Sequence, residues 1–222
     1  FDALHAGRIK ALWIACTNPA QSLPNQHRVH EALAACPFVV LQEAFRHTET
    51  CEHADLLLPA ASWGEKEGTV TNSERRVSHV RPAVPAPGQA RADWSITCDF
   101  ARRLEKRLHP ERPSLFDFSS AEALFEEYKS LTRGRDLDLS GLSYARLDEQ
   151  GPQQWPFPPG ADQGTTRLYT DGRFPHDSGR ARFHADPYLA PQEPCTPDYP
   201  LILNSGRLRD QWHGMSRTGT AA

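Results

Sequence analysis

Residues 9–16, IKALWIAC, form a short and nearly continuous apolar run, and the same pattern returns in FVVL (38–41) and DLLL (55–58). Consecutive apolar residues over so short a length are typical of a strand buried on both faces, as in a parallel sheet. Residues 25–35 carry apolar side chains at helical spacing, with Asn25 as a candidate N-cap. Strand, helix and strand in this order predict a βαβ unit, and therefore the α/β fold class with a parallel sheet.

Two further helices are expected in the middle of the chain. Asp93 could cap the first, which runs through Leu108 and has an apolar face. The second begins after a cap supplied by Ser119 or Ser120. The residues of this second helix expected to face inward are Leu124, Phe125 and Tyr128.

Proline marks the part of the chain that is expected to be mostly connection. The sequence has 19 prolines, and 15 of them lie between Pro82 and Pro200, whereas an average chain has about 5% proline. The segments expected outside the regular core are a polar loop (64–79), a long surface crossing (132–164), a hairpin (167–169 with 180–184), a proline-rich linker (187–200) and a new apolar strand (201–203).

Composition argues against several classes of function. The chain has 25 basic and 28 acidic residues, a net charge of -3, so no nucleic-acid partner is expected. It has no run of about 18 apolar residues, so no membrane partner is expected either. The five cysteines form no C-x-x-C, which favours reduced thiols in the cytoplasm. His47, Cys51 and His53 lie close together, but their spacing matches no standard zinc pattern, and a polar loop is the preferred interpretation.

Polar residues follow the first two apolar runs. Asn18 comes after the first run, and Gln42 and Glu43 come after the second. Ligands of parallel α/β sheets bind at the carboxyl ends of the strands. The amide of Asn18 would bond a phosphate or a sugar of the ligand, or Asn18 would form a plain Asn-Pro turn. The carboxylate of Glu43 would accept hydrogen bonds from ribose hydroxyls, or would remain a solvated surface acid. No G-x-G-x-x-G follows the first run, so the ordinary NAD fingerprint is absent.

Two glycine-containing segments could hold an anion. In WGEKEGTVTNSERR (63–76), Lys66 is placed to meet a phosphate, although the charges of this loop could equally satisfy one another. NSGRLRDQWHGMSRTG (204–219) combines arginines and glycines with Trp212 and His213, which could stack on or bond to a heterocycle. The alternative for this second segment is a basic turn that opens a β domain.

These segments resemble a known family. ALWIACTNP (11–19), FVVLQEAFRHTETCEHADLLLPAASWGEKEGTVTNSERRVS (38–78), ARADWSI (90–96) and LILNSGRLRDQWHGMSRTG (201–219) are similar to parts of the molybdenum-bis(molybdopterin guanine dinucleotide) oxidoreductases of the dimethyl-sulfoxide-reductase superfamily. The final segment is most similar to the catalytic subunits of bacterial assimilatory nitrate reductases. Formate dehydrogenases and periplasmic nitrate reductases resemble it less there.

The resemblance implies that the chain is a piece of a longer, four-domain subunit. The single methionine, Met215, and the opening residue Phe1 agree with this expectation. Residues 1–185 would be the C-terminal part of the molybdopterin oxidoreductase α/β domain, with a Rossmann-like parallel layer and long surface connections. Residues 186–199 would be a linker, and residues 200–222 would begin a β-barrel-like molybdopterin dinucleotide-binding domain.

The resemblance also implies roles for individual residues. Asn18 would bond a guanosine diphosphate moiety, and Gln42 and Glu43 would hold its ribose. Glu43 departs from the Asp that family members often carry. Lys66 would meet phosphate or guanine oxygens, and Asp93 would accept from guanine N1–H and N2–H₂. The residues implied to wrap the other dinucleotide are Ser205, Gly206, Arg207, Gln211, Trp212, His213 and Gly214.

The implied activity is the reduction of nitrate to nitrite by molybdenum-bis(molybdopterin guanine dinucleotide). A [4Fe-4S] cluster and the molybdenum ligand would lie in the missing N-terminal part. Electrons would come from ferredoxin, flavodoxin or an NADH-linked donor. Alternatives are a formate dehydrogenase, a periplasmic nitrate reductase or a non-catalytic structural subunit. We expect the isolated fragment to be inactive and to retain cofactor poorly, because half of the binding cleft is absent.

Overall fold

The computed structural model describes residues 1–206, 208, 209 and 211. The chain divides into two units, Phe1–Thr170 and Asp171–Ala222. No helix in the described part of the chain is both long and apolar enough to cross a membrane.

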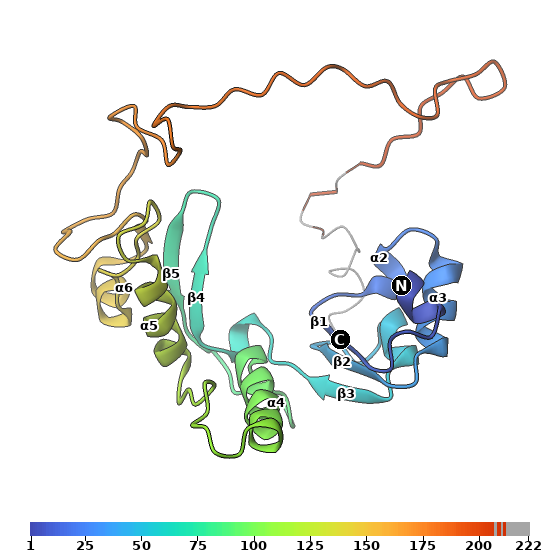
Figure 1. Cartoon of the computed structure of the whole chain (residues 1–222), viewed down its shortest axis with the longest axis horizontal. Coiled ribbons are helices and arrows are strands. Elements are labelled where there is room, and N and C mark those ends of the chain that lie inside the picture. The colour runs from blue at the N-terminus through green and yellow to red at the C-terminus, as the bar shows by residue number, and fades with distance from the viewer. Residues whose placement is uncertain (207, 210, 212–222) are drawn as a thin grey trace. The chain divides into compact units, whose positions relative to one another are not determined.

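A three-stranded parallel sheet opens the first unit (Figure 1). Its strands are β1 (Leu12–Ala15), β2 (Val39–Glu43) and β3 (Leu56–Pro59), in the order β1-β2-β3. The predicted βαβ unit is therefore confirmed. The expected burial on both faces applies best to the central strand, where Val39 and Leu41 on one face and Gln42 on the other are at most 2% exposed, whereas Leu56 in β3 is 43% exposed.

Helices α1 (Asp2–His5), α2 (Pro19–Ser22) and α3 (Gln26–Ala35) pack together beside this sheet. The apolar face of α3 buries Val29, Ala32 and Leu33 in one core with β2 because these residues recur at helical spacing. Asn25 occupies the N-cap position but makes no side-chain bond to the helix. Its φ of 54° is left-handed, whereas a capping residue normally has extended backbone, so the predicted N-cap position is confirmed without a side-chain capping bond. The short helix η1 (Glu49–His53) leads into β3.

The segment expected to be a polar loop forms a β-hairpin instead. Strand β4 (Gly68–Thr71) pairs antiparallel with β5 (Arg76–Val80), and β6 (Gln153–Gln154) adds to the other edge of β5. The turn is held by Asn72 Oδ1, which accepts from the backbone N–H groups of Glu74 and Arg76 at 3.0 and 2.9 Å. Asx side chains that bond their own backbone in this way favour turns.

A second core lies in the region expected to be a surface crossing. Helices α5 (Ala121–Thr132) and α6 (Tyr144–Gln150) lie along the hairpin β4–β5 (Figure 1). Their apolar side chains enclose Phe157 and Leu142, which are 0% and 1% exposed. The prediction that 132–164 crosses the surface was therefore wrong. The core was missed because its apolar residues lie in several short segments that show no regular hydrophobic spacing.

The cap of α5 was predicted correctly, and its inward face only in part. Ser120 Oγ accepts from the N–H of Ala123 at 3.1 Å. Phe125 is buried as expected, but Tyr128 is 54% exposed. Lys129 is buried instead. Its ammonium donates to the carbonyl of Leu142 and lies 5.3 Å from the ring centroid of Phe125.

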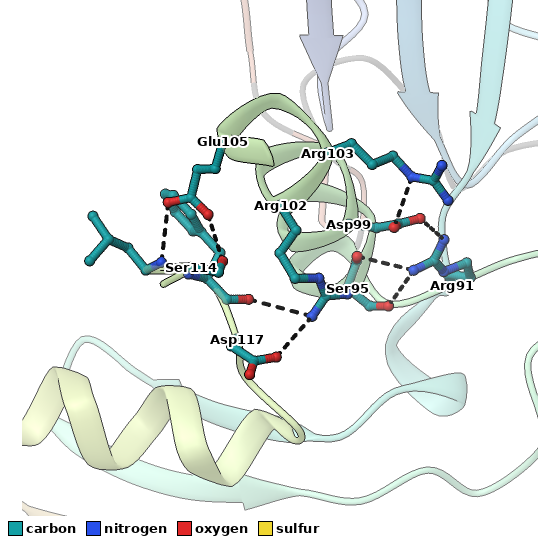
Figure 2. Close-up of polar contacts among 10 residues, drawn as sticks. Arg91, Ser95, Asp99, Arg102, Arg103, Glu105, Ser114 and Asp117 are labelled. Atoms are coloured by element: carbon teal, nitrogen blue, oxygen red, sulfur yellow. Dashed lines mark hydrogen bonds and ion pairs between the residues drawn. The ribbon is translucent and has the colours of Figure 1, made fainter. Parts of the chain in front are cut away.

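Helix α4 (Asp93–Leu108) has the predicted bounds. Asp93 is its first residue rather than its cap, which is Ala92. Figure 2 shows the polar contacts of its outer side, where Asp99 accepts from Arg91 and Arg103 at 3.1 Å each. Glu105 accepts from the hydroxyl of Ser114, so the chain that follows α4 is tied back to the helix.

The described residues of the second unit, 171–206, 208, 209 and 211, contain no strand. The hairpin expected at 167–169 and 180–184 and the strand expected at 201–203 were therefore wrong. Their large apolar side chains lack a packing partner, since Phe183 is 94% exposed and Leu203 is 99% exposed. The expected start of a β-barrel-like domain is not confirmed.

Candidate functional site

The candidate site lies where the carboxyl ends of β1 and β2 meet the beginning of α4. The backbone N–H of Cys16, just past β1, donates to the carbonyl of Gln42 in β2 at 3.1 Å. The N–H of Ala61 donates to the carbonyl of Arg91 at 2.8 Å, which fixes the start of α4 beside the end of β3. The sheet therefore brings Asp93 to its own carboxyl edge.

Asp93 is the centre of a four-residue cluster. Its Oδ1 accepts from Gln42 Nε2 at 2.8 Å and from Cys16 Sγ at 3.3 Å. Its Oδ2 accepts from Lys66 Nζ at 2.9 Å. The side chains of Lys66 and Asp93 are 24% and 31% exposed, so this ion pair is partly shielded from water. Three of the residues predicted for one site, Gln42, Lys66 and Asp93, are thus in contact.

The surroundings of Asp93 favour its charged form. Burial opposes ionisation, but the hydrogen bonds from Lys66, Gln42 and Cys16 and the charge of Lys66 lower the pKa of this carboxyl below its usual range. The position of Asp93 in the first turn of α4 adds a favourable interaction with the helix dipole. Burial, and then the hydrogen bond to Asp93, raise the pKa of the Cys16 thiol, which therefore remains a donor.

A cavity of about 240 Å³ adjoins this cluster. Its wall includes Lys66 and Asp93 together with Trp63 and Trp94. The ammonium of Lys66 lies 5.0 Å from the ring centroid of Trp63, which is 63% exposed. Two aromatic rings beside an ammonium and a carboxylate suit a flat heterocycle that carries both hydrogen-bond donors and negative charge.

Gln42 adds a second polar group to the carboxyl edge of the sheet. Its side chain is 2% exposed, and its Oε1 is buried without a hydrogen-bond partner among the described residues. A buried carbonyl oxygen without a partner is unusual in proteins and is consistent with a ligand donor. Gln42 and Glu43 are the last residues of β2 rather than residues past it.

Asn18 and Glu43 make bonds within the chain. Asn18 Oδ1 accepts from the Thr50 hydroxyl at 2.6 Å, and Asn18 Nδ2 donates to Glu49 Oε2 at 2.7 Å. Glu43 Oε1 accepts from the N–H of Ala44 at 2.7 Å, within its own loop. Asn18 therefore links the end of β1 to η1, in agreement with a turn residue that has a structural role.

The other predicted contacts fall in the second unit. Ser205 and Gly206 are exposed, and the backbone N–H of Gln211 donates to the carbonyl of Leu208 at 3.3 Å. Arg207, Trp212, His213 and Gly214 lie outside the described residues.

No group of three or more possible metal ligands occurs in the part of the chain that the structure describes. His53 pairs with His30 of α3, whose Nδ1 lies 2.8 Å from His53 Nε2, rather than with Cys51. Cys51 lies 3.2 Å from the hydroxyl of Thr48. The residues interpreted as a polar loop, 47–53, do lead into β3, but most of them form the short helix η1.

Sequence reasoning missed Cys16 as a member of the site. A cysteine at the end of the first strand was the available signal, because that position faces the ligand edge of a parallel sheet. The contact itself joins residues 77 positions apart, which no local pattern reveals.

Comparisons with known proteins match the chain to one family model and to several longer relatives. Residues 1–103 match the family model Molybdopterin oxidoreductase. The chain is 43% identical to a nitrate reductase of Synechocystis sp. over 99% of this chain and 30% of that protein. It is 39% identical to the assimilatory nitrate reductase catalytic subunit of Bacillus subtilis over 95% of this chain and 29% of that protein. It is 34% identical to an F420-dependent formate dehydrogenase subunit of Methanococcus maripaludis over 96% of this chain and 29% of that protein.

The chain thus spans about 30% of the length of the Synechocystis relative. Among solved structures, acetylene hydratase from Pelobacter acetylenicus is similar in fold, with a TM-score of 0.53 and 20% identity. That match covers 71% of this chain and 21% of the hydratase. It supports the fold alone.

Proposed function

We propose that this chain, whose residues 1–103 match the Molybdopterin oxidoreductase family model, is part of a longer nitrate reductase and supplies cofactor-binding surface to it. The higher identity to nitrate reductases, 43% and 39%, than to a formate dehydrogenase, 34%, supports nitrate as the substrate.

The cluster around Asp93 is the observation that carries this proposal. A carboxylate that accepts hydrogen bonds can read the N1–H and N2–H₂ edge of guanine, and Lys66 can meet a phosphate. The adjoining cavity, the two tryptophans and the orphaned Oε1 of Gln42 fit a purine nucleotide. These residues suit the guanine dinucleotide part of molybdenum-bis(molybdopterin guanine dinucleotide). When bound, that cofactor supplies the two-electron chemistry that reduces nitrate to nitrite.

The contributions of the predicted residues differ. Gln42, Lys66 and Asp93 would contact the dinucleotide directly. Lys66 and Gln42 now donate to Asp93, so a guanine would replace part of this internal bonding. Asn18 and Glu43 would act mainly by shaping the loops that border the nucleotide. Residues 205–214 would contact the second dinucleotide.

The remaining features of the enzyme would lie outside this chain. These are a [4Fe-4S] cluster and the protein ligand of molybdenum. A cytoplasmic location and a ferredoxin, flavodoxin or NADH-linked electron donor complete the proposal. Formate oxidation is the second candidate, and the relative from Methanococcus maripaludis is the observation that favours it.

An assay of the full-length protein with both substrates tests the proposal. The purified protein would be supplied with a reduced viologen and nitrate in one arm, and with an oxidised viologen and formate in the other. We expect nitrite to form and formate to remain. Formate oxidation without nitrite formation would replace the proposal by its alternative, and inactivity in both arms would refute both.

A further inference from the structure

Lys66 and Glu67 send their side chains to different partners. Lys66 has extended backbone, with φ of -135° and ψ of 158°, and successive side chains of an extended chain point in opposite directions. Lys66 reaches Asp93, whereas Glu67 Oε1 lies 3.5 Å from Nε2 of His79 in β5. Both residues nevertheless line the cavity beside Asp93.

The ring of His79 is held firmly in place. Its side chain is 7% exposed, and Nδ1 lies 2.8 Å from Oδ1 of Asp148 in α6. Asp148 also accepts from Arg81 at 2.8 Å. The imidazole stacks on Tyr144 with the ring centroids 3.9 Å apart. These contacts fix the direction of Nε2, which is buried and makes no hydrogen bond among the described residues. Its contact with Glu67 Oε1 at 3.5 Å is an ion pair when the ring is protonated.

The placement of Glu67 matters because of the charges around the cavity. Among the described residues, Lys66 is the only lysine or arginine in the cavity wall, and its charge is already matched by Asp93. A second carboxylate turned towards Lys66 would make the cavity negative and would repel a phosphate. The side chain of Glu67 is 47% exposed, and among the described residues its carboxylate has its ion-pair contact with His79.

We propose that His79 is a positioning residue that holds the Glu67 carboxylate away from Lys66 and so keeps the cavity beside Asp93 open to a phosphate-bearing nucleotide. This inference rests on the proposed function for the nature of the ligand. Asp148 and Arg81 act with His79 by fixing the orientation of its ring.

Cofactor content of the full-length protein tests this role without an activity assay. The variants are His79→Gln, Glu67→Gln and the double variant, with His109→Gln, an exposed histidine just past α4, as the matched control. We expect His79→Gln to lower bound molybdenum and released guanosine monophosphate at least fivefold. Adding Glu67→Gln should restore most of the loss, since the repelling charge is gone.

Rescue separates this role from a purely structural one. If His79 only supported the fold, removing the charge of Glu67 would restore nothing. A double variant as depleted as His79→Gln, or a His79→Gln protein with wild-type content, would overturn the inference.

A double-mutant cycle on unfolding by denaturant distinguishes failure of the inference from failure of the proposed function. We expect a measurable coupling between His79 and Glu67. Zero coupling would overturn the inference and leave the proposed function intact. A wild-type protein that contains no molybdenum and no guanine nucleotide would refute the proposed function. It would also refute the claim that the cavity beside Asp93 binds a nucleotide.

Discussion

Lys66 Nζ lies 2.9 Å from Asp93 Oδ2, although 27 positions separate the two residues. The contact joins the end of the short helix η2 (Trp63–Glu65) to the first residue of α4. It places one positive and one negative charge at the carboxyl edge of a parallel sheet, where α/β proteins bind their ligands. The proposed contact with a guanine nucleotide depends on this pair.

Replacing Asp93 should remove the nucleotide contact. We expect Asp93→Asn in the full-length protein to lower bound molybdenum and guanosine monophosphate about tenfold or more, because a hydrogen bond to a charged group contributes about 1.5–3 kcal/mol. The matched control is Asp99→Asn, which changes the outer side of the same helix (Figure 2). Equal cofactor content in the two variants would contradict the assignment.

Asp93 should also leave a signature in the pH dependence of stability. Burial opposes its charge, but the hydrogen bonds from Lys66, Gln42 and Cys16 lower the folded pKa below the ordinary value of 3.8. A carboxyl with a lowered folded pKa stabilises the protein above its unfolded pKa, and this contribution is lost as the pH falls through the folded value.

The measurement compares wild type with Asp93→Asn. The difference in free energy of unfolding should be constant near neutral pH and should shrink below about pH 4. Denaturant unfolding at a series of pH values checks this expectation. A difference that stays constant into acid would show that the charge of Asp93 adds nothing to folding.

Asn18 should matter for stability through Thr50. Its amide oxygen accepts from the Thr50 hydroxyl at 2.6 Å and from the Thr50 N–H at 3.2 Å, and Thr50 is fully buried. We expect Asn18→Ala to lower the free energy of unfolding by about 2 kcal/mol, since buried polar groups lose their partner. Thr50→Val in a double-mutant cycle is the control, and additive effects would mean that the two side chains do not interact.

Arg75 should be structural rather than phosphate-binding. Its guanidinium donates to the carbonyls of Trp155, Thr165 and Thr166 and lies 5.3 Å from the ring centroid of Trp155. A lysine ammonium cannot donate to all three carbonyls with the geometry of the planar guanidinium. Arg75→Lys should therefore lower the free energy of unfolding by about 2 kcal/mol. Arg76→Lys, at a neighbouring exposed arginine, should cost much less. Equal thermal denaturation midpoints for the two variants would contradict this view.

Elements with a clear period could be predicted from the sequence. The three parallel strands and α4 follow from apolar runs and from helical spacing. The hairpin β4–β5 was missed because GTVT (68–71) is short and is bordered by charged residues. The second core was missed because Leu139, Leu142 and Phe157 come from short pieces that share no period.

The candidate site could be predicted in part for a related reason. Gln42 was found from its place at the end of a predicted strand, and Lys66 from its place in a glycine-containing polar segment. The role of Asp93 followed from the family resemblance alone. The thiol contact of Cys16 and the internal bonding of Asn18 depend on residues 77 and 32 positions away, which only the folded chain brings together.

Elemental and nucleotide analysis of the purified full-length protein tests the central claim most directly. The account predicts molybdenum together with guanosine monophosphate, at about two nucleotides released for each metal atom. A protein that holds no molybdenum, or holds it without any guanine nucleotide, would contradict the claim that the edge of this sheet binds a guanine dinucleotide.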